Sequence, residues 1–82
     1  MINFEFTKHA KDMLIEREIP EKWIFDCIDK PETEYWENNN TVHYVKAIED
    51  FDNRLLRVVV NPFTTPKKII TFFFDRRLKE KK

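Results

Sequence analysis

The 82-residue sequence predicts one α+β domain, in which two N-terminal helices pack on one face of a four- to five-stranded, mainly antiparallel sheet. Three observations support this fold class. Helical periodicity is confined to residues 7–30, alternating or β-branched runs fill residues 32–75, and short loops join these later runs. The expected order of elements is β-α-α-β-β-β-β, with the domain over residues 1–78 and a basic tail over residues 79–82.

The N-terminal segment is predicted to hold a strand and the first helix. Residues 2–6 alternate apolar and polar side chains, as a short strand at the edge of a sheet does. Thr7 is a suitable N-cap for a helix over about residues 7–18. Arg17 falls on the same helix face as Met13, so we expect it among apolar groups, where it needs an acidic or phosphate partner.

A second helix is expected between two prolines. Pro20 suits the first turn of this helix, and Pro31 ends it. The helix face that should pack on the sheet consists of Trp23, Ile24, Cys27 and Ile28. Residues 32–36 are then expected to form a short strand, and residues 37–40 a polar turn.

Three longer strands are predicted over residues 41–48, 54–61 and 68–75. The run over residues 54–61 is apolar on both sides, which is typical of a central strand covered on both faces. Arg57 is the exception, because it lies on one of these otherwise apolar faces. This arginine either is paired or lines a cleft that receives an anion. His43 shares its face only if the register of the two strands preserves parity. In the last strand, alternation places Ile70, Phe72 and Phe74 on one face and Ile69, Thr71, Phe73 and Asp75 on the other.

The composition excludes several kinds of site. A single cysteine, Cys27, rules out an internal disulfide and a cysteine-clustered zinc site. The absence of glycine rules out Walker-type and dinucleotide-binding loops, so turns are expected at Asn38–Asn40 and Asp52–Asn53. His9 and His43 fit no metal-ligand spacing, and we expect no metal and no other cofactor. No apolar run is long enough to span a membrane, which makes the cytoplasm the expected compartment.

The net charge is zero, but the charges are unevenly distributed. Residues 1–53 carry 6 Lys/Arg and 13 Asp/Glu, whereas residues 54–82 carry 9 Lys/Arg and 2 Asp/Glu. Such asymmetry gives either a basic face for phosphates or pairing between the two halves of the chain.

The available side chains favour metal-free phosphodiester transfer, because histidine can move protons and cations can stabilise a crowded phosphate. The candidate catalytic residues are His9, His43 and Arg57. The candidate substrate contacts are Arg17, Lys46, Phe73 and Arg76, with Phe73 as a stacking surface for a base. These candidates also have structural interpretations. His9 can lie at the border of a helix face, Arg17 and Arg57 can form internal ion pairs, and the stem of Lys46 can lie along apolar surface. Phe73 can belong to the core and Arg76 to a solvated tail.

Short motifs add a resemblance to a known family. The run Phe6-Thr7-Lys8-His9-Ala10, with Met13 and then Arg17-Glu18-Ile19-Pro20-Glu21, resembles the opening of a small bacterial family known only as a domain of unknown function. Leu56–Val60 and Ile70-Thr71-Phe72 resemble its paired strands, so the likeness covers about residues 6–77.

That family is similar in organisation to the BrnT and RelE/ParE-like toxins. The resemblance implies N-terminal helices packed on an antiparallel sheet, an open sheet face that acts on RNA or another target, and an antitoxin that blocks it. His9, Arg17 and Arg57 match the family's motifs. Glu18 stands where a glycine is common, and this disfavours a left-handed helix cap at that position.

We therefore expect the toxin of a toxin–antitoxin pair, a RelE/BrnT-like, metal-free endoribonuclease acting on RNA. Its expected partners are an antitoxin protein, RNA or the ribosome, and a second copy of the chain, with no membrane partner. The alternative is a non-catalytic protein-interaction module on the same fold, in which Arg17 and Arg57 are structural. A nucleic-acid binder without catalysis is a third interpretation.

Overall fold

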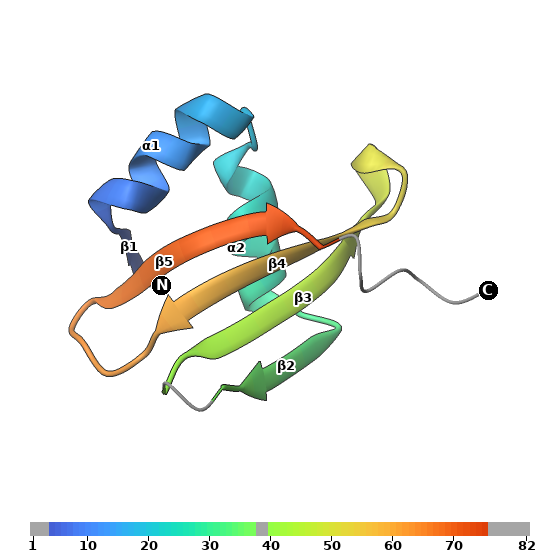
Figure 1. The fold of residues 1–82 in the computed structure, drawn as a ribbon. Helices are drawn as coiled ribbons and strands as arrows, with labels where there is room; N and C mark the ends of the chain where they lie inside the picture. The colour runs from blue at the N-terminus through green and yellow to red at the C-terminus, as the bar shows by residue number, and fades with distance from the viewer. Residues whose placement is uncertain (1–3, 38–39, 76–82) are drawn as a thin grey trace.

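A computed structural model describes residues 4–37 and 40–75. The elements are β1 (Phe4–Phe6), α1 (Lys8–Arg17), α2 (Glu21–Asp29), β2 (Thr33–Trp36), β3 (Val42–Ile48), the 3-10 turn η1 (Glu49–Phe51), β4 (Arg54–Asn61) and β5 (Lys67–Phe74). The strands form one sheet in the order β1-β5-β4-β3-β2 (Figure 1). β1 is parallel to β5, and the other neighbours are antiparallel. The predicted α+β class, the order of elements and the edge position of the first strand are confirmed.

Helix α2 covers one face of the sheet, behind β3 and β4 in Figure 1. Ile24 and Cys27 of this helix are fully buried against Leu56 and Val58 of β4 and Phe72 of β5. Complete burial of such side chains stabilises the fold by about 1.5–3 kcal/mol each. The remaining apolar side chains of β4 on this face extend the same core.

Helix α1 lies along the edge of β5, directly after β1. Thr7 caps it, because its Oγ1 accepts a hydrogen bond from the amide of Ala10 at 3.1 Å. The same hydroxyl donates to the carbonyl of Ile70 at 3.3 Å, and the Thr71 hydroxyl donates to Sδ of Met13 at 3.2 Å. The N-terminal strand and helix therefore cover the side of β5 that faces away from β4. None of the described helices is long and apolar enough to cross a membrane.

The end of α1 differs from the sequence prediction. Arg17 is exposed, and the buried residues of the helix are Ala10 and Met13. The expectation of a buried arginine was wrong because α1 lies along a strand edge, which covers only a narrow stripe of the helix. The cap at Glu18 was also predicted wrongly. This residue adopts the left-handed conformation (φ 53°, ψ 41°), and its amide donates to the Leu14 carbonyl at 3.1 Å.

Strand β5 contains a β-bulge that the sequence did not indicate. The β4–β5 register shifts by one residue between Val59 and Val60. Ile69 consequently lies in the helix-covered core with Phe72 and is fully buried. Its predicted position on the same face as Phe73 was wrong, because the extra residue Ile70 reverses the alternation between the residues before the bulge and those after it.

In this glycine-free chain, residues with other side chains take the turn conformations. Asp52 and Asn53 both have φ of 56°, and Asn40 has φ of 65°. Asn and Asp tolerate this region better than most residues do. The predicted turns are confirmed at these three positions, while residues 38–39 lie outside the described part of the chain.

Candidate functional site

Three polar side chains meet on the sheet face opposite α2. Arg57 Nε donates to Asp75 Oδ2 at 2.8 Å, and Arg57 Nη2 lies 2.6 Å from the same oxygen. On its other side, Nη1 of Arg57 lies 2.9 Å from Nδ1 of His43. The register of β3 and β4 pairs Val45 with Arg57 and His43 with Val59, so both polar residues point to one face. The register thus meets the condition under which the sequence placed His43 on the same face as Arg57.

The ion pair between Arg57 and Asp75 is buried. The two residues are 7% and 6% exposed. A guanidinium removed from water needs an acidic partner, and here the carboxylate supplies both the opposite charge and the hydrogen-bond acceptor. Of the two alternatives left open by the sequence, a paired arginine or an arginine facing an anion cleft, the structure shows the paired one.

The contact with Arg57 also orients the His43 ring. Arginine can only donate, so Nδ1 of the imidazole accepts. A neutral ring that accepts at Nδ1 carries its proton at Nε2, which lies 3.4 Å from Oγ1 of Thr41. His43 is half-buried. The arrangement therefore holds the imidazole on the open face with Nδ1 toward Arg57 and Nε2 toward Thr41.

Aromatic rings enclose this polar group. The Tyr35 ring stacks on His43, with centroids 5.3 Å apart and an interplanar angle of 23°. Cζ of Arg57 lies 5.3 Å from the centroid of Tyr35 and 6.0 Å from that of Phe73. Guanidinium groups bind favourably to such ring faces. We refer to Tyr35, His43, Arg57, Phe73 and Asp75 as the Arg57 cluster.

The structure brings together three of the seven predicted site residues, namely His43, Arg57 and Phe73. His9 is exposed on α1, which lies beside β5, two strands away from the strand of His43. Arg17 is exposed at the end of α1. Arg76 lies outside the described residues.

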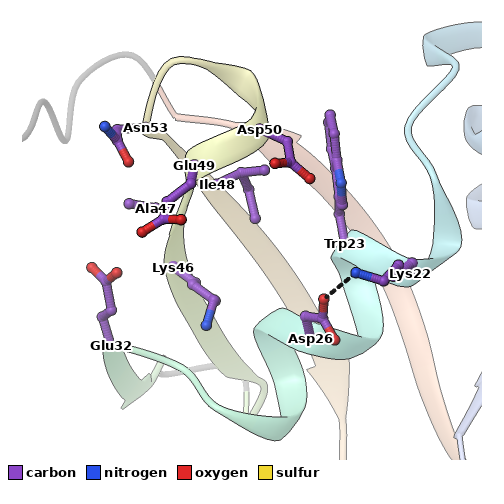
Figure 2. A pocket seen from close by; sticks show the side chains of 10 residues that line it. All are labelled: Lys22, Trp23, Asp26, Glu32, Lys46, Ala47, Ile48, Glu49, Asp50 and Asn53. Carbon is purple, nitrogen blue, oxygen red and sulfur yellow. Dashed lines mark ion pairs between the residues drawn. The ribbon is translucent and has the colours of Figure 1, made fainter.

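The seventh residue, Lys46, lies on the other side of the sheet, at a pocket between α2 and the end of β3 (Figure 2). Its Nζ donates to the carbonyl of Lys30 at 3.3 Å. The pocket has a volume of about 460 Å³, and Lys22 and Asp26 form an ion pair of 3.6 Å at its rim. It is lined by Lys22, Trp23, Asp26, Glu32, Lys46, Ala47, Ile48, Glu49, Asp50 and Asn53. Four carboxylates against two lysines make the lining predominantly acidic.

Two members of the Arg57 cluster were missed from the sequence. Alternation places Asp75 on the same face as Phe73, but its contact with Arg57 depends on the β4–β5 register, which pairs Arg57 with Phe73 and brings Asp75 beside Leu55. Tyr35 lies opposite His43 in the β2–β3 pair. Its position as an acidic residue at the end of the last predicted strand was the signal that could have identified Asp75 as a partner for Arg57. Tyr35 gave no comparable signal. Among the described residues, no three His, Cys, Asp or Glu side chains are grouped so that they could hold a metal ion.

The far edge of the sheet carries a second feature, formed by β2 and the loop between β4 and β5. Trp36 and Phe63 are 56% and 67% exposed, and their ring centroids lie 5.8 Å apart. Glu34 on the same strand is exposed, as are the flanking residues Glu32 and Glu37. β2 is the terminal strand in the described sheet. An aromatic pair therefore lies beside an open, acidic strand.

The fold and the site define a small α+β domain with two helices, a mixed five-stranded sheet and a polar cluster on the uncovered sheet face. The chain belongs to the family described as "Domain of unknown function (DUF4258)", whose model matches residues 6–74. No curated protein and no solved structure matches the chain significantly. The sequence-based assignment to a family of unknown function is thus confirmed, while the likeness to BrnT and RelE toxins stays a prediction.

Proposed function

We propose that the protein is a non-catalytic interaction module that binds a partner protein in the cytoplasm through its sheet. The observation that carries this proposal is the pairing of Arg57 with Asp75. The nuclease hypothesis depended on a cation held on the sheet without a protein carboxylate, ready for a phosphate. A guanidinium that is already neutralised, and is 7% exposed, is poorly suited to that role.

The charge of the domain also favours a protein partner over RNA. The full chain has 15 Lys/Arg and 15 Asp/Glu and therefore no net positive charge, and its described residues 4–75 contain 10 Lys/Arg and 14 Asp/Glu. Binding to a nucleic-acid backbone draws most of its affinity from positively charged side chains. A chain with no net positive charge, an acidic terminal strand and exposed aromatic rings is better matched to a partner with basic and apolar groups.

One observation favours a second candidate, the toxin with metal-free endoribonuclease activity that an antitoxin blocks. Nδ1 of His43 lies 2.9 Å from Nη1 of Arg57, Nε2 lies 3.4 Å from Oγ1 of Thr41, and the ring lies on the sheet face opposite α2. In that mechanism its Nε2 would exchange the proton with the ribose or the leaving oxygen. Arg57 would then act as a positioning residue for the ring and not as a phosphate contact.

A cleavage assay with two variants separates the candidates. Purified protein is incubated with mRNA, with and without ribosomes, and binding to the product of the neighbouring gene is measured by calorimetry. The interaction module leaves RNA intact and binds the neighbouring product with the same Kd in the wild type and in His43→Gln. RNA cleavage that disappears in His43→Gln would overturn it.

The thermal stability of Arg57→Ala provides the second criterion. Loss of a buried, paired arginine should lower Tm clearly if its role is structural. If Arg57→Ala instead keeps the Tm of the wild type but no longer inhibits growth when its expression is induced in cells, the result would favour the enzyme.

A further inference from the structure

The geometry of β2 points to a specific mode of binding. We propose that an extended, basic segment of a partner protein adds to the sheet as a sixth strand beside β2. This inference rests on the proposed interaction function and names the surface and the chemistry of the partner.

Backbone groups of β2 are available for such pairing. The amide of Glu37 donates to the carbonyl of Thr41 at 2.9 Å. Because backbone groups in an antiparallel pair alternate in direction, the amide of Tyr35 faces β3, while those of Glu34 and Trp36 face away from the described sheet. Strand edges with free donors and acceptors are templates for an added strand. At the opposite edge the terminal strand is β1, which has three residues and leads directly into α1, whereas β2 has four residues and is the longer terminal strand of the described sheet.

The side chains around β2 indicate what kind of strand would bind. Glu32, Glu34 and Glu37 are exposed within and beside β2, and they disfavour a second copy of the same strand by charge repulsion. They complement Lys or Arg at alternating positions of a partner. The aromatic pair of Trp36 and Phe63 offers an apolar anchor at the end of the edge, of the kind that dominates binding energy in interfaces.

The test uses synthetic peptides as probes of the full chain. One peptide alternates lysine with valine over eight residues, and its counterpart replaces each lysine by glutamate. Intrinsic tryptophan fluorescence gives Kd, and amide exchange measured by NMR locates the contact. We expect at least about tenfold tighter binding of the lysine peptide, with new protection at the amides of Glu34 and Trp36.

A matched pair of variants tests the backbone contact. Glu34→Pro removes an amide N–H that points away from β3 and leaves the hydrogen bonds between β2 and β3 in place. Proline is accepted at such positions of an edge strand. Glu34→Thr removes the same charge but keeps the amide. Binding at least about tenfold weaker for Glu34→Pro than for Glu34→Thr is the expected result.

Three outcomes would overturn the inference: equal binding of both peptides, equal Kd for the two variants, or self-association of the chain through β2. If the product of the neighbouring gene binds while β2 stays unprotected, only this inference fails. Cleavage of RNA dependent on His43 would remove the proposed function itself.

Discussion

Asp75→Asn is the most informative single substitution, because it keeps the shape of the side chain and removes its charge. Arg57 would then remain buried beside a neutral amide, while its geometry toward His43 is unchanged at the start. Leaving one partner of a buried ion pair without its counter-charge costs about 3–5 kcal/mol. The expected effect is therefore a large loss of stability.

The size of this loss can be compared with the stability of the whole domain. An 82-residue domain has a free energy of unfolding of roughly 4–12 kcal/mol. For a domain of this size, 1 kcal/mol corresponds to about 4–8 °C in Tm. A loss of 3 kcal/mol should thus lower Tm by at least about 12 °C. Thermal melts followed by circular dichroism, together with urea titration, measure both quantities.

Two matched variants show whether the charge is responsible. Asp26→Asn breaks the Lys22–Asp26 pair, whose side chains are 78% and 52% exposed, and should cost only about 0.3–0.5 kcal/mol. The double variant Arg57→Met with Asp75→Leu replaces both charges by apolar groups and should be far more stable than Asp75→Asn. A Tm for Asp75→Asn within about 3 °C of the wild type would refute the reasoning that this pair is a structural necessity.

Three further predictions concern the rest of the fold. Burial raises the pKa of the Cys27 thiol to about 12 in the folded protein. Above pH 9 the unfolded chain loses the thiol proton while the folded protein keeps it. The free energy of unfolding should therefore fall with rising pH, by up to about 1.4 kcal/mol per pH unit. Melts from pH 8 to 11 should show a shallower fall in Cys27→Ala, and equal slopes would contradict the argument. Glu18→Gly should stabilise the protein by about 1 kcal/mol in urea titrations, because glycine adopts the left-handed cap without a steric penalty; Glu16→Gly, within the exposed part of α1, should instead destabilise it by a similar amount. Thr7→Ala should cost about 1 kcal/mol through loss of the α1 cap, and Thr7→Ser should retain most of it.

The sequence was sufficient to predict the elements and their order, because each carries its own periodicity. It left open whether His43 and Arg57 share a face, because that depends on the register of β3 and β4, and the register seen in the structure places them together. The partner of Arg57 was not predictable in the same way. Asp75 faces Arg57 only because β4 and β5 pair in one specific register, and that pairing depends on contacts between distant residues.

The errors have a common physical origin in tertiary packing. Periodicity along α1 could not reveal that the helix lies along a strand edge, which leaves Arg17 in solvent. Alternation along β5 could not reveal the bulge that moves Ile69 into the core. Local preference argued against a left-handed Glu18, but the hydrogen bond to Leu14 and the following turn hold it there. In each case a long-range or cap interaction overrides a local pattern.

The Arg57 cluster also connects the interior of the sheet to its open edge. Asp75 follows β5, Arg57 belongs to β4, His43 to β3 and Tyr35 to β2, so one residue from each of four neighbouring chain segments contacts the next. A slip of two residues would keep each apolar side chain of these strands on its own face, so the apolar pattern alone does not exclude it. A slip would separate the guanidinium from its carboxylate and bury both charges unpaired. We infer that the polar row selects one register and thereby fixes β2, the strand to which we assign partner binding, in position for docking.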